Sequence, residues 1–314
     1  MVDSTYLLNV ENLSQHFKSG RGKNKILVKA VDEVSFGVKP AETFGLVGES
    51  GCGKTTTGRT IIRLYDPVGG KVSFDGRDIS GKMDGDLRRY LTDNIAMIFQ
   101  DPVESLNPRM TVQEIVGEGL RVRGERDRSV VRDKVIEVLR KVGLNEEHAS
   151  RYPHEFSGGQ RQRIGIARAI IIRPKMIIAD EPVSALDVSI QAQVINLLND
   201  LKEEMGLTIL FIAHNLSVVK YFSDRVGVMY YGKLVEVARG DDLYQKPLHP
   251  YTRALLSAIP EPNPVTERTR LRIDYDPARD HDYSTEQPQM HEVEPEHLIY
   301  CSKSELERYK SMIG

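Results

Sequence analysis

The sequence of 314 residues predicts an α/β fold, and three observations support that prediction. Two near-continuous apolar runs, "KMIIADEP" and "LTILFIAHN", have the length of strands and suit parallel strands that are buried on both faces. The segment between them, "ALDVSIQAQVINLLNDLKEEMG", has helical spacing. A glycine-rich loop, "GESGCGKT", lies between a strand-like run and a helical segment, as in phosphate-binding folds.

The other elements follow from the same reasoning in chain order. Strands are predicted at "YLLNV", "VDEVSFGV", "TFGLVG", "KVSFDG" and "NIAMIFQ", with a polar, basic loop "KSGRGKNK" between the first two. "TTTGRTIIRLY" predicts a helix, and the pattern is helical from Thr111 to about Arg173. "RVGVMYYGKLVEVAR" predicts a hairpin that turns at Tyr231 and Gly232. After about Gly240 the chain becomes rich in proline, histidine and charge, until a final helical "SKSELERYKSMI".

Composition excludes several classes of protein. The 43 basic and 45 acidic residues give a net charge of -2, which does not support a broad polyanion-binding face, so no nucleic-acid partner is expected. Two distant cysteines, Cys52 and Cys301, do not make a disulfide scaffold. The N-terminus has no secretory pattern, and no apolar stretch is long enough to cross a bilayer. We therefore expect a cytosolic chain that works at a membrane only by docking on another chain.

The loop "GESGCGKT" fits the P-loop pattern G-x-x-x-x-G-K-[ST] in the required strand-to-helix context. Backbone N–H groups and the helix N-terminus favour phosphate oxygens there. Lys54 is expected to reach the β- and γ-phosphates, and the Thr55 hydroxyl to bind Mg²⁺. Cys52 is interpreted as a small loop residue rather than a redox group. Nucleotide contacts are expected from Gly48, Glu49, Ser50, Gly51, Cys52, Gly53, Lys54, Thr55 and Thr56.

Four polar residues stand at the ends of apolar strands. Asp180 is expected to bind Mg²⁺ directly or through water, and Glu181 to polarise the attacking water. Gln100 could touch both Mg²⁺ and that water, and His214 could contact the γ-phosphate. Each of these residues alone is a weak signal, because a single histidine at a strand end is more often structural. Their order after a P-loop in the same chain strengthens all four assignments.

A second glycine-rich stretch, "FSGGQRQR", begins about a hundred residues after the first. The ordered set of P-loop, Gln100, "SGGQ", "DE", "SALD" and His214 resembles the nucleotide-binding domain of ABC transporters over about residues 6–260. The resemblance implies ATP and Mg²⁺ as cofactors, a RecA-like core, an antiparallel β subdomain, an α-helical subdomain and a C-terminal extension. It also implies that two such domains pair head to tail, so that "SGGQ" serves the ATP on the other subunit's P-loop.

The resemblance assigns roles to further residues. Ser157 caps the helix that follows, and Gly158 and Gly159 let the backbone approach the distal γ-phosphate, with Gln160 completing the signature. Asp187 would lie at the dimer seam. Phe17 occupies the position of the family's adenine-stacking aromatic, although a core aromatic is the alternative.

Longer segments indicate which group of ABC transporter ATPases the chain resembles. "FQDPVESLNPRMTV", "RYPHEFSGGQRQRIGIARAI" and "PLHPYTRALLSAIP" are similar to the oligopeptide/dipeptide importer ATPases, and to their F-type subunit more than to its D-type partner. The implied domains are a nucleotide-binding domain at 1–240, with a helical subdomain at about 103–172, and an extension at 241–314. The implied partners are two membrane permeases, a D-type ATPase in a heterodimer and, indirectly, an extracytoplasmic substrate-binding protein. The implied location is the cytoplasmic side of the membrane.

Several alternatives stay open. The transported solute could be an oligosaccharide rather than a peptide, the ATPase pair could be a homodimer, and a non-transport ABC ATPase is a more distant possibility. In the family the segment "DPVESLNPRM" receives a permease helix, so substitutions at Leu106 or Pro108 should uncouple transport from hydrolysis. The tail offers one cysteine, which cannot supply the four ligands of an iron–sulfur cluster. The histidines of the tail are interpreted as solvated rather than metal-binding: His249, His281, His291 and His297.

Overall fold

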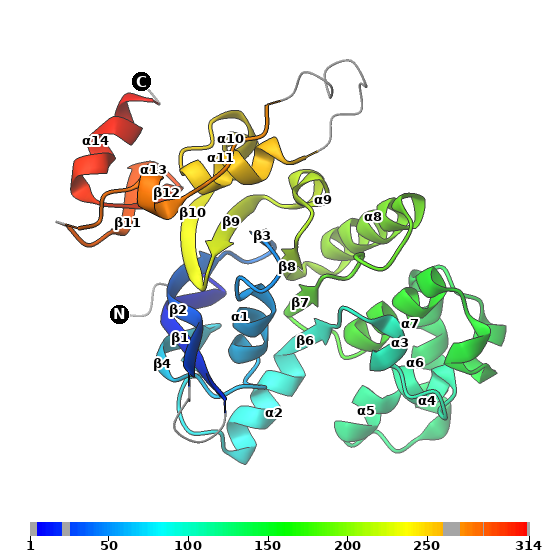
Figure 1. The fold of residues 1–314 in the computed structure, drawn as a ribbon. Coiled ribbons are helices and arrows are strands. Elements are labelled where there is room, and N and C mark those ends of the chain that lie inside the picture. The colour runs from blue at the N-terminus through cyan, green and yellow to red at the C-terminus, as the bar shows by residue number, and fades with distance from the viewer. Residues whose placement is uncertain (1–4, 21–25, 260–270, 285, 313–314) are drawn as a thin grey trace. The chain divides into compact units, whose positions relative to one another are not determined.

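The computed structural model describes residues 5–20, 26–259, 271–284 and 286–312, and it shows two compact units (Figure 1). The first unit contains Met1–Val38, Glu42–Ser80 and Ala213–Gly314. The second contains Lys39–Ala41 and Gly81–Ile212. The greater part of the basic loop predicted between the first two strands, residues 21–25, lies outside the described residues.

The first unit begins with a four-stranded antiparallel sheet in the order β2-β1-β4-β5. Its strands are β1 (Leu8–Ser19), β2 (Ile26–Val38), β4 (Gly69–Phe74) and β5 (Arg77–Asp78). β1 and β2 pair along their whole length, from Leu8 opposite Val38 to Ser19 opposite Ile26. Buried and exposed residues alternate along parts of β1, as expected for a sheet with one face on the core. The strands predicted in this region are confirmed.

A second group of strands in this unit carries the phosphate-binding motif. β3 (Thr43–Val47) runs parallel to β9 (Arg225–Tyr230), and the order continues through β10 (Lys233–Arg239) and β12 (His297–Cys301) to β11 (Gln289–Glu294). Pairing from β9 to β11 is antiparallel. Tyr231 and Gly232 both have positive φ, 42° and 83°, which matches the right-handed twist of a two-residue hairpin. The predicted hairpin is therefore confirmed.

The helices of the first unit connect these strands. They are α1 (Lys54–Ile61), α9 (Leu216–Phe222), α10 (Gly240–Gln245), α11 (Pro250–Ser257), α13 (Pro277–Asp280) and α14 (Lys303–Ser311). The C-terminal segments form a small core in which Leu248, Ile299, Cys301 and Tyr309 are buried together. The extension therefore folds onto the strand group through β12, which pairs with β10. The domain boundary at 240 stays a prediction.

The second unit is built on three parallel strands in the order β8-β7-β6. They are β6 (Ile95–Ile98), β7 (Met176–Asp180) and β8 (Thr208–Ala213), and every residue in them is buried, which explains their unbroken apolar runs. The helical segments are α2 (Gly85–Asn94), α3 (Pro102–Ser105), α4 (Val112–Val116), α5 (Glu118–Val122), α6 (Arg128–Lys141), η1 (Glu146–Ser150), η2 (Pro153–Glu155), α7 (Gly158–Ile170) and α8 (Val188–Met205).

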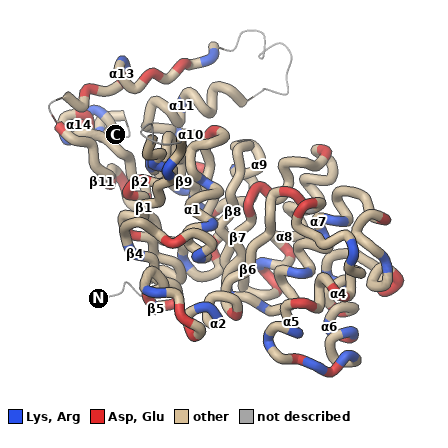
Figure 2. Tube along the Cα trace, turned by 60° about the horizontal axis from the view of Figure 1, so that its bottom comes forward, with Lys and Arg blue, Asp and Glu red and all other residues tan. Residues whose placement is uncertain are grey.

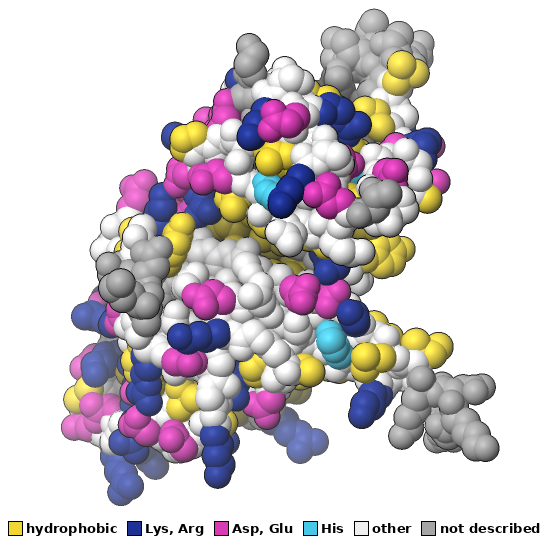
Figure 3. Space-filling model, turned by 90° about the vertical axis from the view of Figure 1, so that its left-hand side faces the viewer, with side chains coloured by type: hydrophobic (Ala, Val, Ile, Leu, Met, Phe, Trp, Pro, Cys, Tyr) yellow, Lys and Arg dark blue, Asp and Glu magenta, His cyan; other side chains and the backbone are white. Residues whose placement is uncertain are grey.

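Charges of both signs are interspersed along the chain. Figure 2 shows acidic and basic residues mixed along α5 and α6 of the second unit. On the face drawn in Figure 3, acidic and basic side chains also alternate, so that face presents no field of a single sign. Among the described residues, no helix is both long enough and apolar enough to span a membrane.

Candidate nucleotide-binding site

The loop from Gly48 to Gly53 joins β3 to α1 and requires glycine at two positions. Gly48 has a φ of +152°, and a Cβ there would stand 2.2 Å from the carbonyl oxygen of Met229. Gly53 has a φ of +110°, and a Cβ there would stand 2.1 Å from the carbonyl oxygen of Ala30. Side chains at either position would push the loop away from its neighbours. The backbone N–H groups of the loop therefore stay at the N-terminus of α1, where a phosphate is favoured.

Lys54 is the first residue of α1, and its side chain is held by the loop itself. The residue is 3% exposed. Its ammonium donates hydrogen bonds to the carbonyl oxygens of Gly48 (2.8 Å) and Glu49 (3.0 Å). The chain thus holds one buried cation against the carbonyl groups of the loop, and its contact with the β- and γ-phosphates stays a prediction.

Cys52 lies beside this cation, with its Sγ 3.8 Å from the Lys54 ammonium. Burial raises the pKa of the Cys52 thiol, and the neighbouring Lys54 only partly opposes that shift. A thiol with a raised pKa is a poor nucleophile and a poor redox centre at neutral pH. The environment supports the interpretation of Cys52 as a small loop residue.

The remaining loop residues are more accessible. Glu49, Ser50 and Gly51 are exposed, and Thr55 and Thr56 are half-buried in the first turn of α1. A loop with an open outer side and a buried cation beneath it can receive phosphate oxygens from solvent.

Phe17, on β1, is 36% exposed, so it is not a core aromatic. Its ring meets the ring of Tyr65 edge to face, with centroids 5.3 Å apart. An exposed ring held by a neighbour suits stacking on a base. Tyr65 was not predicted as a site residue, because it belongs to none of the nucleotide-binding motifs.

The acidic pair stands at the end of β7 in the second unit. Asp180 is fully buried, whereas Glu181 is half-buried. Glu181 has a positive φ of 45°, which costs a non-glycine residue about 1–2 kcal/mol. This conformation is held by the Glu181 N–H bond to the Ile212 carbonyl (2.9 Å) and by Ser184, which donates to the Glu181 carbonyl. Strain of this kind is common where a side chain must point into a functional site.

Gln100 and Glu181 lie together within this unit. The Gln100 Nε2 donates to the Glu181 Oε2 at 3.3 Å, although the residues are 81 positions apart in the chain. The structure thus brings two of the predicted site residues into contact. Asp180 and Gln100 in this unit, and the Thr55 hydroxyl in the first unit, each carry an oxygen atom of the kind that Mg²⁺ prefers, so the chemistry of each side chain fits that ion. Within the described residues, no cluster of three or more His, Cys, Asp or Glu side chains suits a metal ion.

The signature "SGGQ" forms the start of α7. The Ser157 Oγ accepts from the Gln160 N–H (3.4 Å), and the Gln160 Oε1 accepts from the Ser157 N–H (3.1 Å), which makes a capping box. Ser157 and Gly158 are exposed. A Cβ on Gly159 would stand 2.7 Å from the Cγ2 of Ile190 on α8, so packing requires glycine there. The exposed N-terminus of α7 is therefore open to an anion from outside this unit.

Two further predicted residues are exposed. Asp187 is the N-cap of α8, but its side chain makes no capping hydrogen bond. His214 follows β8 directly in the chain and is exposed. The P-loop and His214 belong to the first unit, and Gln100, the acidic pair and the signature belong to the second. The predicted roles of these residues stay predictions.

One expectation is wrong, and one residue chosen for a test is unsuitable. Three of the four tail histidines are buried rather than solvated: His249 is 1% exposed, His281 8% and His297 3%. The side-chain partners of His281 and His297 are Glu305 and Glu236, 24 and 61 positions away, and the composition of the tail does not reveal them. Leu106 is 2% exposed, so a substitution there would disturb packing and could not isolate a docking effect. Pro108 and Val103 are exposed and serve that purpose better.

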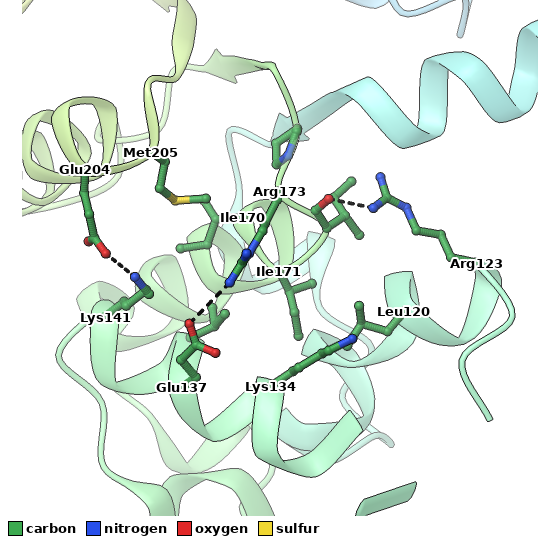
Figure 4. Close-up of a pocket in the computed structure, with 13 residues that line it drawn as sticks. Leu120, Arg123, Lys134, Glu137, Lys141, Ile170, Ile171, Arg173, Glu204 and Met205 are labelled. Carbon is green, nitrogen blue, oxygen red and sulfur yellow. Dashed lines mark hydrogen bonds and ion pairs between the residues drawn. The ribbon is translucent and has the colours of Figure 1, made fainter. Parts of the chain in front are cut away.

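A pocket of about 610 Å³ lies within the second unit, between α5, α6 and the C-terminal ends of α7 and α8 (Figure 4). Its apolar floor includes Leu120, Ile170 and Ile171. The charges at its mouth pair with each other, Lys141 with Glu204 and Arg173 with Glu137. None of the predicted site residues lines it, so this pocket is separate from the nucleotide chemistry.

Comparison with known families agrees with this geometry. Residues 31–184 match the family described as "ABC transporter". Residues 235–284 match the family described as "Oligopeptide/dipeptide transporter, C-terminal region". The first match contains the P-loop, Gln100, the signature and the acidic pair, and the second contains α11.

The chain is similar to curated proteins over nearly its whole length. It is 55% identical over 304 residues to the oligopeptide transport ATP-binding protein OppF of Bacillus subtilis (strain 168), covering 96% of this chain and 98% of that protein. It is 50% identical over 314 residues to the dipeptide transport ATP-binding protein DppF of Lactococcus lactis subsp. cremoris (strain MG1363), covering 99% and 98%.

A solved structure shares the fold. A dimeric ATP-binding cassette in a post-hydrolysis state, bound to ADP and Pi, is 30% identical with a TM-score of 0.67. The similarity covers 74% of this chain and 98% of that one. Its likeness to this chain confirms the predicted fold class of a P-loop ATPase cassette.

Proposed function

Because the chain belongs to the ABC transporter family of ATPases, we propose that it is the ATP-hydrolysing subunit of an importer for oligopeptides or dipeptides. The observation that carries the proposal is a P-loop with a buried Lys54 in a chain that matches peptide-transport ATPases over nearly its full length. Importers of oligosaccharides use the same kind of machinery, but the relatives named for peptides favour the peptide assignment.

The chain's own residues have distinct parts in the proposed reaction. The P-loop amides and Lys54 bind and orient the phosphates, and Phe17 packs on the base. Glu181, with Gln100 beside it at 3.3 Å, orients the attacking water and draws its proton. When bound, Mg²⁺ neutralises phosphate charge, and Thr55, Gln100 and Asp180 are the residues that would hold it.

The exposed signature of α7 supports assembly with a second ATPase. Ser157 and Gly158, at the start of α7, are exposed and therefore accessible to a phosphate from outside this unit. We infer that they complete the ATP site on a partner's P-loop, and that this partner is a related D-type ATPase. Two membrane permeases would hold the pair on the cytoplasmic side of the membrane, and a substrate-binding protein would deliver the solute.

Lys54→Ala tests the central assignment. Loss of the cation from the β/γ-phosphates should abolish ATP turnover in the assembled complex, because transition-state charge is no longer neutralised. Lys202→Ala, which removes a lysine near the end of α8, is the control. A correctly assembled Lys54→Ala complex with normal ATPase activity would show that the site is assigned wrongly.

Docking to a permease has its own test. Substitution of exposed Val103 or Pro108 with aspartate should lower transport in reconstituted vesicles while leaving the nucleotide affinity unchanged. Transport at the normal rate in both variants would exclude this segment as the permease contact.

A further inference from the structure

The C-terminal extension contacts the phosphate-binding loop through one tyrosine. The hydroxyl of Tyr251, on α11, accepts a hydrogen bond from the backbone N–H of Glu49 at 3.2 Å. The two residues are 202 positions apart in the chain. Both belong to the first unit, so the contact lies within one compact body.

The bonded N–H belongs to the same peptide group as the carbonyl that holds Lys54. The Gly48 carbonyl accepts from the Lys54 ammonium at 2.8 Å, and the Glu49 N–H donates to Tyr251. In a planar trans peptide these two groups point in opposite directions. Tyr251 and Lys54 therefore hold one peptide group from its two sides, and rotation of that group would break both bonds.

Glycine makes this peptide group dependent on an outside anchor. Gly48 lacks a Cβ and has a φ of +152°, so its own backbone preference does not select one orientation of the following peptide. The Glu49 carbonyl accepts from both Lys54 (3.0 Å) and the Cys52 N–H (3.2 Å), and these bonds hold the peptide group that follows Glu49. The hydrogen bond from the Glu49 N–H to the Tyr251 hydroxyl holds the peptide group that precedes Glu49.

Tyr251 is itself rigid. It is 2% exposed, and its ring lies 4.4 Å from the ring of Tyr230 and 5.5 Å from that of Tyr275. Burial raises the pKa of Tyr251, so its hydroxyl stays neutral at physiological pH and can accept the amide hydrogen. The anchor is a fixed phenol rather than a mobile side chain.

The start of α11 is held by buried polar groups from β10 and from the extension. The Glu236 carboxylate, on β10, accepts from the N–H groups of Leu248 (2.8 Å) and His249 (3.0 Å). His297, on β12, bonds to the same carboxylate at 2.8 Å. The His249 Nδ1 then accepts from the Tyr251 N–H at 3.1 Å. A continuous line of bonds therefore runs from β12 to the phosphate-binding loop.

We propose that Tyr251 is a positioning residue for Lys54, and that through it the C-terminal extension sets the affinity of the chain for ATP. The inference rests on the proposed function of the P-loop. It gives the extension a role in the nucleotide site of its own chain. Tyr251 acts through the Gly48–Glu49 peptide and does not itself touch the nucleotide.

Tyr251→Phe in the full-length chain tests the proposal, with Tyr230→Phe as the matched control. Tyr230 belongs to the same ring cluster, and its hydroxyl makes no hydrogen bond among the described residues. The Kd for AMP-PNP, measured in the presence of Mg²⁺, should rise about three- to tenfold in Tyr251→Phe, because the variant loses one neutral hydrogen bond. The Kd should stay unchanged in the control. An unchanged Kd in Tyr251→Phe would overturn the proposal.

A double-mutant cycle separates positioning from general destabilisation. In a Lys54→Ala background, Tyr251→Phe should not weaken AMP-PNP binding further, because its effect passes through Lys54. A full additional loss in that background would show that Tyr251 acts only as a structural residue.

Hydrogen exchange provides a readout that does not depend on nucleotide. The amide of Glu49 should exchange faster in Tyr251→Phe than in the wild type or in Tyr230→Phe. Equal exchange in all three proteins would contradict the proposal. If the wild-type chain bound no AMP-PNP, the proposed function would fail, while faster exchange in Tyr251→Phe would still support the positioning of the loop.

Discussion

At the scale of single residues, Glu181 stands in a backbone conformation that its side chain does not favour. Its positive φ and the hydrogen bond from Gln100 both fix the direction of one carboxylate. A strained conformation persists only where surrounding bonds hold it, as the Ile212 carbonyl does here. The direction of the Glu181 carboxylate is therefore fixed, and a substitution that keeps the shape of the side chain can test the chemistry of its oxygen atoms.

Glu181→Gln keeps the size and the strained backbone but removes the basic oxygen. ATP hydrolysis should fall about 10²- to 10⁴-fold while ATP binding is retained, because a general base contributes on that scale. Single-turnover hydrolysis with radiolabelled ATP measures the loss, and sedimentation with ATP should show a dimer that stays closed. Glu203→Gln, an exposed acid of α8, is the control. Normal turnover in Glu181→Gln would exclude it as the group that activates water.

His249 illustrates a residue whose burial sets its chemistry. Burial lowers the pKa of His249 from 6.5 to about 3, with the nearby His281 acting in the same direction. The unfolded chain therefore binds a proton between pH 6.5 and 3 that the folded chain does not bind. This contribution to stability is intact above pH 6.5 and is lost progressively as the pH falls below it.

His249→Asn should remove this pH dependence and keep the cap of α11, since asparagine is a good N-cap residue. On lowering the pH from 7 to 5, the wild type should lose about 2 kcal/mol more stability than the variant. Calorimetric Tm values at both pH values measure the difference. Parallel losses in the two proteins would show that His249 does not titrate in this way.

At the scale of elements, the sequence predicted those strands and helices whose signals are local. Continuous apolar runs predicted β7 and β8, which are buried along their whole length. The Tyr231–Gly232 pair predicted the β9–β10 hairpin. The P-loop and the Ser157 cap of α7 were also predicted from short motifs, and the structure adds the reciprocal bond of Gln160 that completes a capping box.

Elements that depend on distant partners were not predicted. β11, "QMHEVE", contains glutamates and a histidine and resembles a solvated segment, and β12, "HLIYC", is a run of only five residues in a tail rich in charge and histidine. They form strands because β12 pairs with β10 and because His297 reaches the Glu236 carboxylate. The Tyr251 contact with Glu49 was missed for the same reason, since no local pattern connects positions 202 apart.

Glu236 is the buried group on which the extension depends. The residue is fully buried, and three donors converge on its carboxylate. Glu236→Gln places an amide NH₂ against one of these donors and leaves it unsatisfied, which should cost about 2 kcal/mol or more. The unfolding Tm should fall by several degrees, whereas Glu307→Gln, which breaks an exposed pair with Lys310, should change it little. Equal Tm values for the two variants would contradict the role assigned to Glu236.

At the scale of the whole molecule, the chain contains a P-loop and a signature but exposes the signature to solvent. Lys54, Glu181 and the other residues predicted to hydrolyse ATP are all present in the sequence, so we predict that the chain is not the silent member of an unequal pair. In the similar solved cassette, the structure is a dimer bound to ADP and Pi. These facts favour pairing with a second ATPase, and the resemblance to F-type subunits leads to the prediction that this chain's "SGGQ" completes the ATP site of a distinct D-type partner.

Substitution of Ser157 tests that prediction in the assembled transporter. Ser157→Asp keeps a capping oxygen for α7 but places a negative charge where the partner's γ-phosphate would bind, and Ser157→Arg adds bulk. Ser157→Ala, which removes only the cap, should cost about 1 kcal/mol of stability and serves as the control. Site-resolved nucleotide trapping should show that less nucleotide is trapped at the partner's P-loop. Trapping at the Lys54 site of this chain should persist, because the unaltered signature of the partner completes that site. Equal loss at two identical sites, in a complex that contains only this ATPase, would instead establish a homodimer.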